Sequence, residues 1–181
     1  MAAAGVAGAP AELDADEPQY RLSLRALGVP KGQGALAPLS LDPATAVRWR
    51  MAYDLELHVT TGEAARAGAE AWVAQAIKRD GHRFLAVDGR PVAMTGFNAR
   101  LPSIVQVGGV YVPPDGRGRG LAGRAVALHL SEARRAGAET ATLFAASARA
   151  ARTYERLGFG RIGDYALVLF RGRPVAGGVS A

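Results

Sequence analysis

A glycine- and arginine-rich segment in the second half of the chain carries the residues best suited to bind an anion. Residues 104–121 read IVQVGGVYVPPDGRGRGL. The apolar start is typical of a central strand, which Pro113-Pro114 ends because proline has no N–H to donate. The glycines that follow let backbone N–H groups turn toward one point, and the next helix start adds unpaired donors and about half a positive charge. Three arginines add full charges: Arg117, Arg119 and Arg124.

This segment predicts a phosphate or pyrophosphate site, the alternative being a tight turn with solvated arginines. Gly108-Gly109 inside the strand indicates a bulge or the close approach of another molecule. A P-loop would need Gly-Lys-Ser/Thr, which is absent here. Gly118–Gly123 matches G-x-G-x-x-G, but the next predicted strand ends without an acidic residue, so a dinucleotide fold is disfavoured.

The sequence gives little indication of metal binding, disulfides or covalent nucleophilic catalysis. The chain has no cysteine, which excludes thiolate metal sites, disulfides and cysteine nucleophiles. Ser147 has no His–acid pair nearby in sequence, which disfavours a covalent acyl-enzyme. His58 and His82 stand alone without metal-ligand spacing, and His129 lies beside an apolar helical stripe, so we expect it to be structural. We expect no metal.

The elements that must position these residues alternate in an α/β order. A strand is expected over 20–27, a loop over 28–40, and a helix that Asp42 caps and that buries Val47, Met51 and Leu55. The further expected strands cover 83–87, 91–98, 104–112, 140–145 and 164–170. The further expected helices cover 63–79, with an apolar face from Ala69 to Ile77, then 121–136 and 149–157.

Antiparallel strands joined by the Asp88-Gly89 hairpin signal precede a strand–helix–strand unit. This order predicts an α/β (α+β) fold with a mixed, mostly antiparallel sheet and helices on its faces.

Composition sets broader limits on the class of protein. The 181 residues suit one domain, and the net charge of +6 favours anionic partners in general. Arginine outnumbers lysine 20 to 2, but the basic residues are scattered without interleaved aromatics, so we expect no nucleic acid. No apolar run is long enough to span a membrane. Residues 1–18 lack the features of a secretory signal and are expected to form a disordered tail, which makes the cytoplasm the expected location.

Two sequence motifs resemble those of the GCN5-related N-acetyltransferases. Arg117–Ala122 resembles the family's Arg/Gln-x-x-Gly-x-Gly/Ala signature. Ala150-x-x-x-Tyr154-Glu155-x-Leu157-Gly158-Phe159 resembles its second hallmark, 33 residues further along the chain. The resemblance covers about residues 83–170. It implies an acyl-CoA N-acyltransferase-like fold in which a parallel strand pair splays apart to bind acetyl-CoA as cosubstrate.

The resemblance also implies roles for individual residues. Tyr154 matches the family's general acid, which protonates the departing CoA thiolate. Ser147 stands where the family often has Asn and would hydrogen-bond the cosubstrate. Val110 and Val112 would offer backbone groups to the pantetheine arm. The implied pyrophosphate cradle consists of Arg117, Gly118, Arg119, Gly120, Leu121 and Ala122.

The implied function is direct transfer of an acetyl group to a primary amine in a ternary complex. A non-catalytic acyl-CoA-binding or regulatory module is the alternative, because the first splayed strand has Gln106 and no acid. The base stays open between water, Asp54 and Glu56.

The expected organisation is a tail over 1–18, an acceptor-binding lobe over 19–80, the acetyl-CoA-binding core over 81–171 and a tail over 172–181. Phe97, Asn98 and Tyr111 are expected to shape the acceptor pocket. Glu132, Arg134 and Arg135 are expected to be solvated. The sequence leaves a homodimer open.

Overall fold

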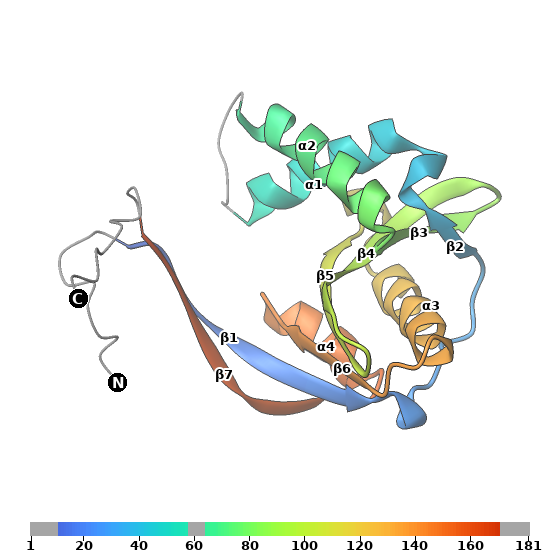
Figure 1. Ribbon diagram of the computed structural model, residues 1–181, viewed down its shortest axis with the longest axis vertical. Helices are drawn as coiled ribbons and strands as arrows, with labels where there is room; N and C mark the ends of the chain where they lie inside the picture. The colour runs from blue at the N-terminus through green and yellow to red at the C-terminus, as the bar shows by residue number, and fades with distance from the viewer. Residues whose placement is uncertain (1–10, 58–63, 171–181) are drawn as a thin grey trace, which may run out of the picture.

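The computed structural model describes residues 11–57 and 64–170, which form one sheet with helices around it (Figure 1). The strands of these residues are β1 (Ala11–Ser23), β2 (Ala35–Pro38), β3 (His82–Val87), β4 (Arg90–Arg100), β5 (Ile104–Tyr111), β6 (Thr140–Phe144) and β7 (Gly160–Phe170). Their α-helices are α1 (Pro43–Glu56), α2 (Ala64–Arg79), α3 (Leu121–Arg135) and α4 (Ala148–Glu155). None of these helices is both long and apolar enough to cross a lipid bilayer.

The sheet is mixed, and most neighbouring strands run antiparallel. Its strands follow the order β2-β3-β4-β5-β6-β1-β7. β5 and β6 are parallel, and each of the other neighbouring pairs in this order is antiparallel. The predicted fold class is therefore confirmed, with α3 as the crossover that a parallel pair requires.

The parallel pair diverges along its length. β5 and β6 are paired from Ile104–Thr140 to Gln106–Thr142. Beyond these positions both strands continue without pairing to each other in the described residues. The backbone edge of β5 that faces β6 is therefore left open toward the C-terminal ends of the two strands, as the resemblance implied.

Helices cover both faces of the sheet. Phe84 and Met94 pack with side chains of α1 and α2, whereas the neighbouring residues Leu85 and Ala93 pack with Ala125 of α3. Side chains alternate across a strand, so these clusters lie on opposite faces. Figure 1 shows α1 and α2 together on one side of β3–β5 and α3 on the other.

The N-terminal strand is longer than the sequence suggests. β1 begins at Ala11, so the tail predicted over 1–18 is wrong for residues 11–18. Strand β7 supplies the backbone partners of this segment, and the two form a long ribbon that extends from the sheet (Figure 1). Residues 35–38 pair with β3 as a short edge strand, which corrects the loop expected there. Residues 1–10 and 172–181 lie outside the described residues.

Helix α1 begins as predicted but buries a different face. Asp42 caps it by accepting a hydrogen bond from the Thr45 amide at 2.9 Å. Val47 packs against the core as predicted, but Leu55 is 47% exposed and Met51 is not part of the core cluster, so the predicted apolar face is wrong for these two residues. The buried Asp54 forms an ion pair with Arg50 at 2.7 Å, and the Arg50 guanidinium lies 4.4 Å from the Trp72 ring centroid. Burial of a paired charge is a feature that apolar periodicity cannot detect.

Two predictions that rest on local signals are confirmed. In α2, Ala69, Val73 and Ala76 are buried, which is the apolar face expected from their spacing. Between β3 and β4, Asp88 and Gly89 have φ of 49° and 74°, as a two-residue hairpin turn requires.

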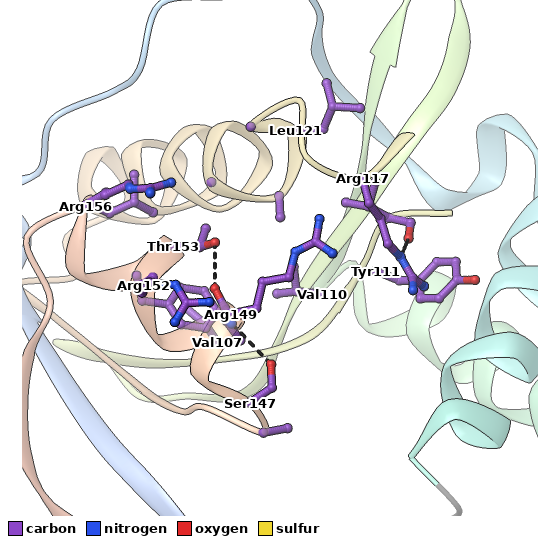
Figure 2. Close-up of a pocket in the computed structure, with 18 of the residues that line it drawn as sticks. Val107, Val110, Tyr111, Arg117, Leu121, Ser147, Arg149, Arg152, Thr153 and Arg156 are labelled. Carbon is purple, nitrogen blue, oxygen red and sulfur yellow. Dashed lines mark hydrogen bonds between the residues drawn. The ribbon is translucent and has the colours of Figure 1, made fainter. Parts of the chain in front are cut away.

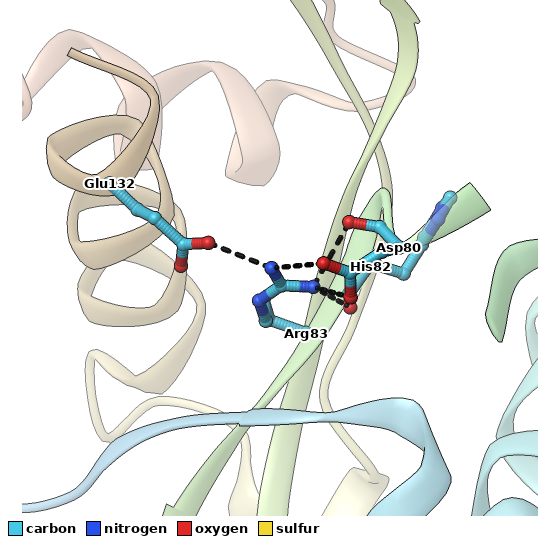
Figure 3. A network of polar contacts seen from close by, with 4 residues as sticks. All are labelled: Asp80, His82, Arg83 and Glu132. Carbon is cyan, nitrogen blue, oxygen red and sulfur yellow. Dashed lines mark hydrogen bonds and ion pairs between the residues drawn. The ribbon is translucent and has the colours of Figure 1, made fainter. Parts of the chain in front are cut away.

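A polar network ties β3 to helices on both of its sides (Figure 3). The Arg83 guanidinium donates to the Asp80 carboxylate at 2.6 Å and to Glu132 of α3 at 2.7 Å. Arg134 donates to the Leu24 carbonyl at 3.1 Å. Arg134 and Arg135 are exposed, as expected, whereas Glu132 is only partly exposed and pairs with Arg83.

Candidate active site

A cavity of about 1060 Å³ lies where β5 and β6 diverge. Residues 107–112 of β5 and its end line one wall, and Phe144 and Ser147 lie across from them at the end of β6. The strand-to-helix turn 116–123 and helix α4 complete the wall (Figure 2). The cavity therefore brings together both motifs that the sequence singled out.

The glycine-rich turn has the backbone conformation that an anion cradle needs. Gly118 and Gly120 have φ of 84° and 76°, in the left-handed region that favours glycine. A Cβ at Gly120 would meet no atom within 4 Å, so the turn is open above this residue. Among the described residues, no backbone carbonyl accepts from the Gly118, Arg119 or Gly120 amide. The first helical amides of α3, which begins at Leu121, likewise lack intrahelical acceptors.

Arg117 does not point its charge into this turn. Its guanidinium donates to both carboxylate oxygens of Glu56, at 2.6 and 2.8 Å, and to the Val112 carbonyl at 2.9 Å. It also lies 5.7 Å from the centroid of the Tyr111 ring. The ion pair raises the pKa of Arg117 above its ordinary value. This side chain therefore connects the turn to the end of α1, and it also lines the cavity.

The other two arginines of the segment are not directed at the cavity. Arg124 donates to the carbonyls of Pro30, Gln33 and Gly34 at 2.6, 2.7 and 3.1 Å, so it fastens the 28–34 segment to α3. Arg119 is exposed and is not part of the cavity wall. Gly118 and Gly120 of the turn line the cavity, and so does Arg117, whereas Arg119 and Arg124 do not.

The double glycine of β5 forms the predicted bulge. The register between β4 and β5 shifts beside Gly96, and Gly109 has φ of 61°. A Cβ on Gly108 would lie 2.1 Å from the Asn98 amide oxygen, so any other residue there would displace the Asn98 side chain. Val110 and Val112, which follow the bulge, both line the cavity. The Val112 carbonyl is already bound by Arg117, which leaves the rest of the β5 edge for a ligand.

Tyr154 lies on α4 and contributes to the cavity wall while being 8% exposed. Burial, with a smaller effect of Tyr53, raises the pKa of its phenol well above the ordinary value. The group is therefore a neutral O–H donor at neutral pH, and no described residue is hydrogen-bonded to its hydroxyl. Gly158, with φ of 95°, ends the helix so that Leu157 and Phe159 both enter the core beside it.

Ser147 is at the cavity edge and caps α4. Its Oγ accepts a hydrogen bond from the Ala150 amide at 3.2 Å. The hydroxyl proton stays available to a ligand, because this bond uses only a lone pair.

Three arginines that the sequence analysis did not select line the cavity: Arg149 and Arg152 of α4, and Arg156, the residue that caps the C-terminal end of this helix (Figure 2). Their positions i, i+3 and i+7 place them on one face of a helix. That spacing, next to the motif containing Tyr154, is the signal that would have identified them.

The opposite end of the cavity is formed by the N-terminal part of the chain. Tyr53 and Glu56 of α1 line it together with residues 28–30. Tyr111 also lines the cavity, as expected. Phe97 and Asn98 do not: the Phe97 ring is stacked on His129, with centroids 4.0 Å apart, and Asn98 fills the space beside Gly108.

Comparison with known proteins decides the family. The model of the Acetyltransferase (GNAT) family matches residues 49–159, which is more than half of the chain. The chain belongs to this family. Membership supports acetyl transfer as the type of chemistry. No curated protein matches the chain significantly.

Solved structures agree with the fold. A GNAT-family acetyltransferase from Novosphingobium aromaticivorans is 26% identical with a TM-score of 0.60, over 94% of this chain and 71% of that one. A GCN5-related N-acetyltransferase from Kribbella flavida is 20% identical with a TM-score of 0.58, over 93% of this chain and 62% of that one. This chain thus spans less than two thirds of the Kribbella protein.

An acetyltransferase from Clostridium acetobutylicum, solved with acetyl-CoA, is 15% identical with a TM-score of 0.56, over 71% of this chain and 89% of that one.

Proposed function

We propose that this GNAT-family chain transfers the acetyl group of acetyl-CoA to a primary amine in a ternary complex, with Tyr154 as the general acid. The observation that carries the proposal is the meeting of three features in one cavity. These are the turn of unbonded amides at Gly118–Gly120, the open edge of β5, and the buried neutral phenol of Tyr154.

The chain's own backbone fits the cosubstrate. Amides of Gly118 to Ala122 would hold the diphosphate, since helix N-termini and successive N–H groups favour anions. The unpaired edge of β5 around Val110 would accept the pantetheine arm as a sheet accepts an added strand. This arrangement directs the thioester toward the bulge at Gly108-Gly109, where a backbone N–H can polarise its carbonyl.

The chemistry then needs one bond to form and one to break. The amine nitrogen attacks the thioester carbon, the C–S bond breaks, and Tyr154 donates its proton to the leaving sulfur. Holding the two reactants together supplies a large part of the rate. Tyr154 is protonated at neutral pH and so carries the proton that the acid role needs. Because burial raises its pKa, proton transfer to the sulfur requires that the bound cosubstrate stabilise the phenolate as it forms.

The amine must also lose a proton, and Glu56 is the carboxylate nearest to this task. It lines the cavity, whereas Asp54 is buried against Arg50 and does not. Both oxygens of Glu56 accept from Arg117, so we propose that Glu56 orients the ammonium group or a water that accepts the proton. We also propose residues 19–80 as the acceptor lobe, because Tyr53 and Glu56 belong to it.

Replacement of Tyr154 by Phe tests the mechanism. Turnover should fall by on the order of 10²-fold with acetyl-CoA affinity nearly unchanged, because only the proton donor is removed. Thiol release with a panel of amines measures turnover, and isothermal titration measures affinity. Tyr20→Phe is the control, since Tyr20 is also a buried tyrosine but does not line this cavity.

Unchanged turnover in Tyr154→Phe would remove Tyr154 from the acid role. Tight binding of acetyl-CoA without thiol release from any amine would favour the non-catalytic acyl-CoA-binding module instead.

A further inference from the structure

The arginines of α4 form a cluster of positive charge without a counter-charge. Arg149, Arg152 and Arg156 line the cavity, and no described residue forms a hydrogen bond or ion pair with their guanidinium groups. Arg50, Arg83 and Arg161, in contrast, all have carboxylate partners. Among the described arginines that line the cavity, these three are unpaired, whereas Arg117 is bound to Glu56.

This arrangement opposes the stability of the helix itself. Like charges three and four residues apart on a helix repel one another. Arg149 also lies in the first turn, where the helix dipole disfavours a cation. An anion bound among the three side chains would remove both penalties.

The cluster continues the anion site that the glycine-rich turn begins. A Cβ on Gly118 would lie 4.0 Å from a terminal nitrogen of Arg149, so this guanidinium reaches the turn. A Cβ on Gly123 would lie 3.4 Å from the Thr153 methyl group, so the first turn of α3 packs directly against α4. Arg152 and Arg156 follow Arg149 by about 4.5 and 10.5 Å along the helix axis. Figure 2 shows Arg149 nearest the turn and Arg152 and Arg156 further from it.

We propose that Arg152 and Arg156 bind the 3′-phosphate of coenzyme A, with Arg149 placed between it and the diphosphate. This inference rests on the proposed function, because it assumes that the diphosphate occupies the turn. One ribose separates the 3′-phosphate from the diphosphate, and the arginines continue along α4 in the same way. A phosphomonoester carries nearly two negative charges at neutral pH, and arginine binds its oxygens in a bidentate manner.

The test compares acetyl-CoA with acetyl-dephospho-CoA, which lacks only the 3′-phosphate. Isothermal titration of the wild-type chain should give about ten- to hundredfold tighter binding of acetyl-CoA, as expected for charge-assisted hydrogen bonds. In Arg152→Gln/Arg156→Gln the two ligands should bind equally, with the affinity for acetyl-dephospho-CoA nearly unchanged. The control Arg79→Gln/Arg135→Gln removes two exposed charges far from the cavity and should keep the wild-type preference.

Equal affinities for the two ligands in the wild-type chain would overturn the inference, and so would a preserved preference in the α4 variant. Either result leaves the proposed function standing, because acetyl-CoA still binds. Failure of both ligands to bind the wild-type chain would instead contradict the proposed function and the inference together. The wild-type comparison needs no variant, so it decides the question even if a variant folds poorly.

Discussion

Two arginine-bearing segments border the same cavity and use their charge in opposite ways. At the turn, Arg117 is bound by Glu56, and Arg124 by three carbonyls of the 28–34 segment. On α4, the guanidinium groups of Arg149, Arg152 and Arg156 have no described partner and line the cavity. Proximity of an arginine to a glycine-rich turn therefore does not make it a ligand. In the proposed complex, the backbone provides the anion site at the turn, and the side chains provide it on α4.

The largest expected effect comes from closing the turn. Gly120→Asp should lower acetyl-CoA affinity at least 100-fold, because it places bulk and negative charge beside the amides and strains a residue with φ of 76°. Isothermal titration measures the affinity. Gly137→Asp is the matched control, since Gly137 has φ of 101° and open space but lies at the other end of α3. Equal loss of affinity in both variants would mean that strain, not the cradle, explains the effect.

Two buried histidines, His82 and His129, differ from the arginines of the cavity. An unpaired positive charge at either position is unfavourable in the folded chain. Burial, followed by nearby arginines, lowers the pKa of His82 to about 4 and that of His129 to about 3. In the unfolded chain both groups titrate near 6.5, so the unfolded state binds more protons between these values. Stability should therefore be complete above about pH 6.5 and fall as the pH drops toward 4.

By pH 5 each buried histidine should contribute on the order of 2 kcal/mol to this loss. Urea unfolding at pH 7.5, 6 and 5 measures it. His129→Phe, which keeps a ring against Phe97, should flatten the dependence. An unchanged slope in that variant would show that His129 does not remain neutral in the folded state.

A smaller change in acetyl-CoA affinity should distinguish the arginine of the turn, Arg117, from those at α4. Arg149→Gln should weaken acetyl-CoA binding about tenfold, because it removes a charge beside the diphosphate. Arg117→Gln should leave this affinity within about twofold and raise the KM for the amine instead, because it releases Glu56 and the end of α1. Titration and steady-state kinetics distinguish the two outcomes. The reverse pattern would mean that the turn arginine, and not that of α4, contacts the phosphate.

Signals between residues a few positions apart in the sequence predicted most of the helices and strands. The Asp42 cap, the apolar spacing of α2 and the Asp88-Gly89 turn depend on residues a few positions apart, and each is confirmed. The two motifs predicted that the turn and Tyr154 belong to one site, and both line the same cavity.

Long-range partners could not be read from the sequence. Arg117 is hydrogen-bonded to Glu56, 61 positions away in the sequence, and Arg83 to Glu132, 49 positions away. The sequence shows that these charges exist, but only the packing of α1 and α3 against the sheet decides which of them meet. The same holds for β1, whose partner β7 lies near the other end of the chain.

A crystal structure grown with acetyl-CoA tests the central claim most directly. We expect the diphosphate oxygens of acetyl-CoA to lie within about 3 Å of amide nitrogens between Gly118 and Ala122, and the thioester to lie between β5 and β6. A bound thioester that leaves the turn empty, or a diphosphate held elsewhere on the chain, would contradict it.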